Sequence, residues 1–151
     1  MKIANMYNHL NGYEYMLVHK KQLWEEIESA INSINADDFI KYSKDKAKLG
    51  KTLYDQKNIN KQFRSILYWK SVTIPYYVTG DIDTAKNVAL IRDREEQKQI
   101  IEDNGFEAYS TNNQIDFVKD RVAVEVQFGK YFSVAYDLHV KHTFFFLRND
   151  I

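Results

Sequence analysis

IDFVKDRVAVEVQFGK, residues 115–130, is the stretch that decides the fold of this chain. Residues 115–118 and 122–128 are rich in β-branched and aromatic side chains, which favour strands. The polar residues 119–121 between them are few enough to reverse the chain as a hairpin loop. The sequence therefore predicts two paired strands joined by a tight turn.

Side chains alternate between the two faces of a strand, so Glu125 and Gln127 share one face of the second predicted strand. If the hairpin closes around residues 119–121, Asp116 lies near the level of Glu125 and can meet it across the ladder. Two carboxylates with a flanking polar group suit Mg²⁺, which takes one or two carboxylates and keeps several waters for substrate phosphate. Because such an ion polarises a phosphodiester, the stretch predicts a metal-dependent nuclease centre.

The order and spacing of these residues carry a family resemblance. Asp116 is followed nine positions later by Glu125, and both Glu125 and Gln127 lie within VEVQFGK (residues 124–130). This pattern resembles the active site of the BglII/BstYI group of type II restriction endonucleases. This group is a branch of the PD-(D/E)XK nuclease fold that has Gln where most members have Lys, and this chain has the same Gln. The resemblance is most specific at residues 110–142. Further segments resemble the group in the same order: Gly50-Lys51, Trp69-Lys70 and Ile74-Pro75.

The resemblance implies a Mg²⁺-dependent homodimer that hydrolyses both strands of double-stranded DNA at a palindrome with a GATC core. Asp116 and Glu125, with Val126, would be the metal ligands, and Gln127 would orient the attacking water or the scissile phosphate. An amide carries no charge, so stabilisation of the pentacoordinate phosphate falls more on the metal. Lys130 stands where the group places a base-reading side chain, and Lys can donate to guanine O6 and N7.

One departure leaves alternatives open. Members of the group continue beyond the strand that follows the last helix, whereas this sequence ends at Ile151. The first alternative is therefore a truncated, catalytically inactive module of the nuclease fold that binds DNA or a partner. The second is a structural or regulatory protein with a chance D…ExQ pattern, against which the intact Asp116, Glu125 and Gln127 argue. Only an assay of DNA cleavage separates the first alternative from an active enzyme.

Composition sets the broad class of the protein. A chain of 151 residues with 44% hydrophobic and 15% aromatic content suits one folded domain with a real core. No apolar run approaches the ~20 residues that span a bilayer, the first residues lack a secretory pattern, and there is no Cys. We therefore expect a cytoplasmic protein without a membrane segment. A net charge of zero argues against non-specific coating of nucleic acid but allows basic residues to cluster around a cleft.

Residues 1–80 are expected to be mainly helical. Apolar residues recur at helical spacing over residues 21–34, which predicts an amphipathic helix. A second helical segment is expected near Phe39, and a third from Asn58, a good N-cap residue. Residues 15–18 are expected to form a strand.

A run of lysines interrupts this region: Lys41, Lys44, Lys46, Lys48 and Lys51. One interpretation is a solvated face. The other is a set of phosphate contacts, since Lys and backbone amides position a protein on DNA without reading its sequence. Lys51 lies in the part that resembles the nuclease group, so it is the candidate DNA contact.

Residues 71–78 form a β-prone run that contains Pro75, and a proline makes a central strand there unfavourable. A long charged helix is predicted over residues 88–104, with Gly105 just past its end as the C′ residue.

Residues 88–147 are expected to form the catalytic core. A short strand is expected around residues 108–109, followed by a polar turn at residues 110–113 and then the hairpin. Residues 133–142 fit a helix over the sheet, and residues 143–147 are predicted to form a strand. The resulting order, α-β-β-β-α-β, is that of the PD-(D/E)XK core. The predicted fold is therefore mixed α/β, a central mixed β-sheet flanked by helices, in a single domain over residues 1–151.

Other acidic and histidine residues are also candidates for the site. Asp81 and Asp83 are rivals for the first acid of the pair, but we expect them to be loop or cap residues, and Asp120 a turn residue. His139 and His142 have the spacing to share a metal on a helix. No third ligand accompanies them, so ordinary surface or core histidines are the preferred interpretation.

Overall fold

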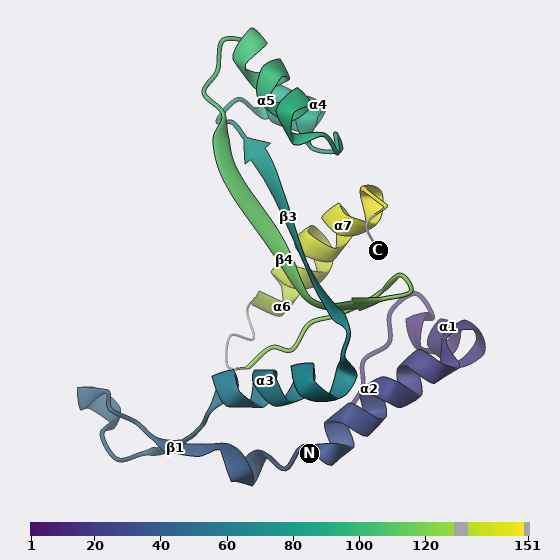
Figure 1. Ribbon diagram of the computed structural model, residues 1–151, viewed down its shortest axis with the longest axis vertical. Helices are drawn as coiled ribbons and strands as arrows, with labels where there is room; N and C mark the ends of the chain where they lie inside the picture. The colour runs from purple at the N-terminus through teal and green to yellow at the C-terminus, as the bar shows by residue number, and fades with distance from the viewer. Residues whose placement is uncertain (129–132, 150–151) are drawn as a thin grey trace. The chain divides into compact units, whose positions relative to one another are not determined.

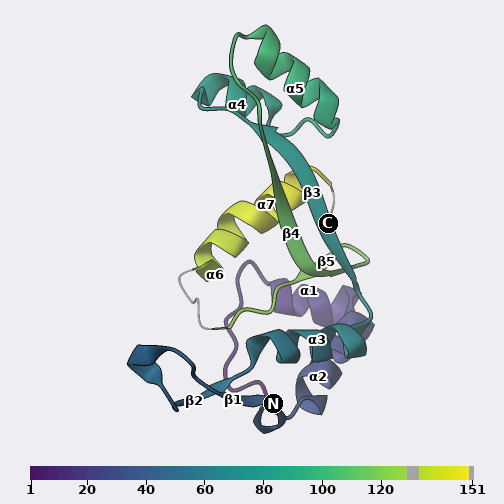
Figure 2. The same ribbon diagram turned by 60° about the vertical axis from the view of Figure 1, so that its left-hand side comes forward.

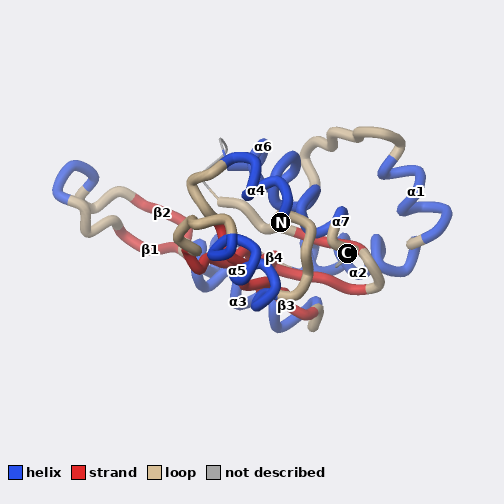
Figure 3. The backbone as a smooth tube through the Cα atoms, turned by 90° about the horizontal axis from the view of Figure 1, so that it is seen from above, coloured by secondary structure: helices blue, strands red, loops and turns tan. Residues whose placement is uncertain are grey.

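The structure of the protein is a computed structural model that describes residues 1–128 and 133–149. The chain divides into two compact units, Met1–Trp69 and Lys70–Ile151. Both units contain helices and strands, which Figure 1 labels and Figure 3 colours by type. The predicted class, a fold with mixed α and β elements, is confirmed.

Two amphipathic helices form the core of the first unit. Helix α2 spans Lys21–Ser33 and α3 spans Gln56–Leu67, and apolar side chains of both are buried: Leu23, Ala30, Ile59, Phe63 and Leu67. Trp69 after α3 is also buried, and its Nε1 donates a hydrogen bond to Glu26 Oε2 at 2.8 Å. The helix predicted over residues 21–34 is confirmed.

Two other predictions for this unit are wrong. Residues 15–18 do not form a strand, because they lie within helix α1, Gly12–His19. The helix expected near Phe39 is a short 3₁₀ turn, Ala36–Phe39, that leads into strand β1, Ile40–Tyr42. Both stretches are short and lack strong periodicity, so local propensity alone decided the predictions.

The N-cap predicted at Asn58 is also wrong. Asp55 is the N-cap of α3, and its Oδ1 accepts a hydrogen bond from Asn58 N at 3.4 Å. The Asn58 side chain donates to Asp55 Oδ2 at 2.9 Å, so the asparagine supports the cap from within the first turn. Asp and Asn cap helices about equally well, and the sequence offers both here.

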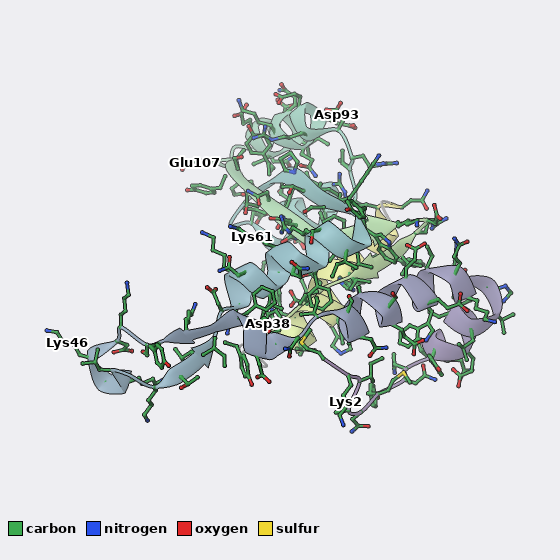
Figure 4. The ribbon with its side chains drawn as sticks, turned by 60° about the horizontal axis from the view of Figure 1, so that its bottom comes forward. Lys2, Asp38, Lys46, Lys61, Asp93 and Glu107 are labelled. Atoms are coloured by element: carbon green, nitrogen blue, oxygen red, sulfur yellow. The ribbon has the colours of Figure 1, made fainter. Side chains whose placement is uncertain are left out.

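The lysine run lies on a β-hairpin. Strand β1 pairs antiparallel with β2, Thr52–Tyr54, and the 3₁₀ turn Lys46–Lys48 lies between the two strands. All five lysines are exposed. Figure 4 shows the Lys46 side chain at the tip of the hairpin, pointing away from it.

Three antiparallel strands form the sheet of the second unit, in the order β3-β4-β5. Their bounds are Lys70–Val78, Tyr109–Lys119 and Val122–Val124. The turn predicted at residues 110–113 is wrong, because β4 runs through these residues and pairs with β3. The long strands β3 and β4 run side by side in the views of Figure 1 and Figure 2. Pro75 lies in β3 opposite Asn112, on an edge strand. The prediction that Pro75 does not occupy a central strand is confirmed.

The single helix predicted over residues 88–104 is wrong, because the structure has two helices. Helix α4 spans Ile82–Val88 and α5 spans Arg94–Asp103. Asp93 begins α5, and its Oδ1 accepts a hydrogen bond from Glu96 N at 2.8 Å. An aspartate in the middle of a charged run thus acts as an N-cap and starts a new helix.

The ends of these two helices follow the predicted capping. Asp81 caps α4, since its Oδ2 accepts a hydrogen bond from Thr84 N at 2.8 Å, which confirms it as a cap residue. Gly105 follows α5 with a φ of 80°, the left-handed conformation expected at C′. Among the helices of the described residues, none is long and apolar enough to cross a membrane.

The last described part of the chain is helical. Helix α6, Ser133–Tyr136, continues through a π-helical turn, Asp137–His142 (η3), into α7, Thr143–Leu147. The helix predicted over residues 133–142 is confirmed, and the strand predicted over residues 143–147 is wrong.

Packing against the sheet explains why the β-prone run is helical. Phe145 of α7 is fully buried against Ile115 of β4. Partly buried side chains surround this pair: Val72, Ile74, Val118, Ala123 and Phe144. Intrinsic strand propensity is a weak preference that such tertiary contacts override.

A buried amide joins the two helices to the sheet. Gln97 of α5 is 1% exposed, and its Oε1 accepts a hydrogen bond from Tyr77 N of β3 at 2.9 Å. Its Nε2 donates to Ile91 O at 2.8 Å and to Val88 O at 3.3 Å. One side chain therefore satisfies three main-chain groups that water does not reach easily.

Replacing Gln97 by Ala is expected to lower the free energy of unfolding. Each orphaned buried polar group costs about 1–3 kcal/mol, so the total loss should be at least about 2 kcal/mol, measured by urea denaturation. Gln99→Ala is the matched control, because Gln99 is exposed on the same helix. Equal effects of the two substitutions would contradict the role assigned to Gln97.

Candidate active site

A two-residue turn joins β4 to β5. Lys119 pairs with Val122, and Asp120 and Arg121 between them have φ values of 46° and 66°. Positive φ at both central residues is what the tight hairpin turn of type I′ requires. The predicted hairpin is confirmed, with Asp120 as a turn residue and a loop one residue shorter than expected.

The pairing of the strands brings the two acids together. Phe117 lies opposite Val124, and the same register carried one position further sets Asp116 opposite Glu125. The main-chain N of Asp116 donates a hydrogen bond to Glu125 Oε1 at 3.3 Å. The predicted adjacency of Asp116 and Glu125 is therefore confirmed.

The second strand is shorter than predicted, because β5 ends at Val124 and does not reach residue 128. The N–H of Val126 donates to Asp116 Oδ2 at 3.3 Å. The Asp116 carboxylate thus accepts a hydrogen bond from a main-chain N–H that, in a longer β-ladder, would donate to a main-chain carbonyl. The chain leaves the sheet at Glu125, where the candidate site begins.

Two residues of the π-helical turn that the sequence interpretation did not assign to the site join it: Lys141 contacts Glu125, and Asp137 contacts Lys141 and Gln127. Lys141 Nζ is 2.7 Å from Glu125 Oε1 and 3.2 Å from Asp137 Oδ1, and these side chains are only 12–15% exposed. Gln127 Nε2 donates to Asp137 Oδ2 at 3.0 Å. The signal in the sequence was the spacing of Asp137 and Lys141, which are four apart and so share one helix face.

Burial and neighbouring charges shift the pKa values in this group. Burial raises the pKa of Glu125 and the negative charge of Asp116 raises it further, while Lys141 offsets part of the increase. Burial alone would lower the pKa of Lys141, but the carboxylates of Glu125 and Asp137 outweigh it and raise that pKa. Lys141 is therefore a cation at neutral pH, beside a crowded pair of acids.

Nearly the whole chain matches a known family. The matching family model is described as restriction endonuclease BglII/BglIII and covers residues 4–151. The chain belongs to this restriction endonuclease family. A search of the curated proteins finds no match. The family assignment confirms the resemblance that the hairpin residues carry.

The acid pair of this family member fits a divalent cation. The described residues hold no cluster of three or more His, Cys, Asp or Glu that could bind a metal. Two carboxylates are nevertheless enough for Mg²⁺, which keeps several water ligands. Burial is the main cause of the raised pKa of Glu125, and the negative charge of Asp116, which a bound cation would relieve, raises it further. Val126, next in the chain, offers a main-chain oxygen.

The remaining candidates do not join this group in the described structure. Lys130 lies outside the described residues, so its base contact stays a prediction. Lys51 is exposed at the β1–β2 hairpin of the first unit. His139 is exposed, and His142 is half-buried with its pKa lowered by burial.

A double-mutant cycle on Glu125 and Lys141 is expected to show strong coupling in the free energy of unfolding. Their ion pair is short and little exposed, so Glu125→Gln and Lys141→Met should couple by about 1.5–3 kcal/mol. Urea denaturation of the wild type, both single variants and the double variant, in EDTA, measures this coupling.

Lys98 and Glu102 of α5 provide the control pair for that cycle. They are 3.8 Å apart and 41% and 49% exposed, so their expected coupling is only about 0.3–0.5 kcal/mol. Similar coupling in the two pairs would show that the Glu125–Lys141 contact is an ordinary surface ion pair.

Proposed function

We propose that this protein is a Mg²⁺-dependent type II restriction endonuclease that hydrolyses both strands of double-stranded DNA. The observation that carries the proposal is the acid pair, in which Asp116 N lies 3.3 Å from Glu125 Oε1. The family assignment supports a nuclease. The resemblance of residues 124–130 supports a homodimer that acts on a palindrome with a GATC core. We propose the cytoplasm as its location.

Each residue of the group has a proposed role. Asp116 and Glu125, with the carbonyl of Val126, would hold Mg²⁺. The bound ion would polarise the scissile phosphate and lower the pKa of water. Gln127 commits its Nε2 to Asp137, so its Oε1 is the end that accepts a hydrogen bond from the attacking water and orients it.

Lysines outside the acid pair would position the DNA. Lys130 is proposed to read a base edge in the major groove, where Lys can donate to guanine O6 and N7. Lys51, exposed at the β1–β2 hairpin, is proposed to contact phosphates without reading sequence.

A second candidate function is a nuclease-fold module that binds DNA or a partner without cutting. The observation in its favour is the 2.7 Å contact between Lys141 and Glu125. An ammonium at that position neutralises one of the two carboxylates that would hold the ion. A cleavage assay separates the two candidates.

Wild-type protein with Mg²⁺ is expected to cut plasmid DNA into discrete fragments, and EDTA should leave the plasmid intact. Asp116→Asn should reduce cleavage to background while specific DNA binding persists, because the variant loses a ligand charge and also some repulsion from phosphate. Gel analysis and a binding assay with cognate duplex measure the two effects.

Asp120→Asn is the matched control, since it removes an acid from the same hairpin at a turn position that Asn also adopts. It should cut like the wild type. A smear of products would indicate a non-specific nuclease, and no cleavage at any protein concentration would favour the binding module.

Lys130→Ala is expected to cost about 1–3 kcal/mol of discrimination between cognate and singly substituted duplexes, because a base contact is lost. Lys51→Ala should instead weaken binding to all sequences about equally and reduce the salt slope by about one. Binding across a salt series measures both effects. Uniform weakening by Lys130→Ala would make Lys130 a phosphate contact.

A further inference from the structure

The proposed reaction lacks a protein cation at the position of Gln127. Negative charge builds up on the non-bridging oxygens of the phosphate in the transition state, and preorganised charged donors stabilise it most. The amide of Gln127 is neutral under all conditions. A positive side chain at the acid pair would supply the missing stabilisation.

Lys141 is such a side chain. Its Nζ lies 2.7 Å from Glu125 Oε1 and 3.2 Å from Asp137 Oδ1, and only 12% of the side chain is exposed. An ammonium has three N–H groups. Within residues 1–128 and 133–149 the structure gives it these two carboxylate partners, which leaves one N–H for a ligand.

A purely structural role explains this arrangement less well. Removing two charges from water costs free energy that their attraction often fails to recover, so a little-exposed ion pair is weak support for a fold. Here the pair also involves an acid whose proposed task is to hold an ion next to the scissile phosphate. The ammonium therefore lies beside the carboxylate that would hold the ion.

We propose that Lys141 is a catalytic residue of this nuclease and donates its remaining N–H to a non-bridging oxygen of the scissile phosphate. The inference rests on the proposed function. In the reaction the water oxygen forms a bond to phosphorus, and the bond from phosphorus to one bridging ester oxygen breaks. That oxygen leaves with the electron pair and takes a proton from solvent, while the attacking water gives its proton to solvent.

In this proposal Gln127 also positions Lys141, through Asp137. Its Nε2 donates to Asp137 Oδ2 at 3.0 Å, and the other oxygen of that carboxylate lies 3.2 Å from Lys141 Nζ. The amide thus fixes the carboxylate that orients the ammonium. Gln127 acts as a positioning residue for the lysine as well as for water.

The absence of Cys from the chain permits a selective test. Lys141→Cys introduces a single thiol, and 2-bromoethylamine converts it into a side chain of lysine's length that ends in an ammonium. Iodoacetamide converts the same thiol into a neutral amide. Lys98→Cys, on the exposed face of α5, receives the same treatments as the control.

The chain of 151 residues is assayed for cleavage with Mg²⁺ and for binding to cognate duplex in EDTA across a salt series. Lys141→Cys is expected to cut about 100- to 1,000-fold more slowly, as when one transition-state donor is lost. Aminoethylation should restore cleavage and carbamidomethylation should not. Without metal, the salt slope of binding should fall by about one for Lys141→Cys and recover on aminoethylation, which a structural ion pair would not cause.

Wild-type rates for Lys141→Cys, or equal rescue by both reagents, would overturn the inference and leave the proposed function intact. A wild type that never cuts would overturn both. Urea unfolding accompanies each assay, and if Lys141→Cys does not fold, Lys141→Gln is tested for the same losses of cleavage and salt slope. A Lys141→Gln variant with wild-type cleavage would likewise overturn the inference.

Discussion

The left-handed turn at Asp120 and Arg121 is the constraint on which the candidate site depends. These two residues, both with positive φ, are the whole connection between β4 and β5, so the turn fixes which residues of the two strands lie opposite one another. Non-glycine residues in this conformation cost about 1–2 kcal/mol each, and the burial of Ile115 and Phe117 on β4 offsets that cost. A slip of one residue would turn Asp116 to the other face of the sheet and separate it from Glu125.

The charges of the side chains at the candidate site determine which ions it attracts. The chain as a whole has a net charge of zero, but the candidate site does not share that balance. Among the described residues, four ionisable side chains form this group, Asp116, Glu125, Asp137 and Lys141, and together they carry an excess of two negative charges when all are ionised. One divalent ion would neutralise that excess, and Lys141 keeps its charge because two carboxylates raise its pKa.

The sequence predicted those parts of the structure that short-range patterns determine. Alternation predicted the hairpin and the meeting of Asp116 with Glu125, and periodicity predicted helix α2. It failed where a distant contact decides the outcome. Phe145 packs on Ile115 and makes a β-prone run helical, and Asp137 and Lys141 join the site only because a helix brings them to the end of β5. The local sequence indicates such contacts only through the four-residue spacing of Asp137 and Lys141.

The π-helical turn Asp137–His142 has a consequence for how this segment can change in evolution. Lys141 contacts Glu125, and Phe145, four residues later on the same continuous helical segment, packs against Ile115 in the core. Each residue of α7 advances the chain by about 100°, so adding or deleting one residue between Thr143 and Phe145 would turn either Lys141 away from Glu125 or Phe145 away from Ile115. Substitutions in this segment can change the side chains at the site, whereas a change in its length would separate the position of the Lys141 ammonium from the packing of Phe145 that holds the helix on the sheet.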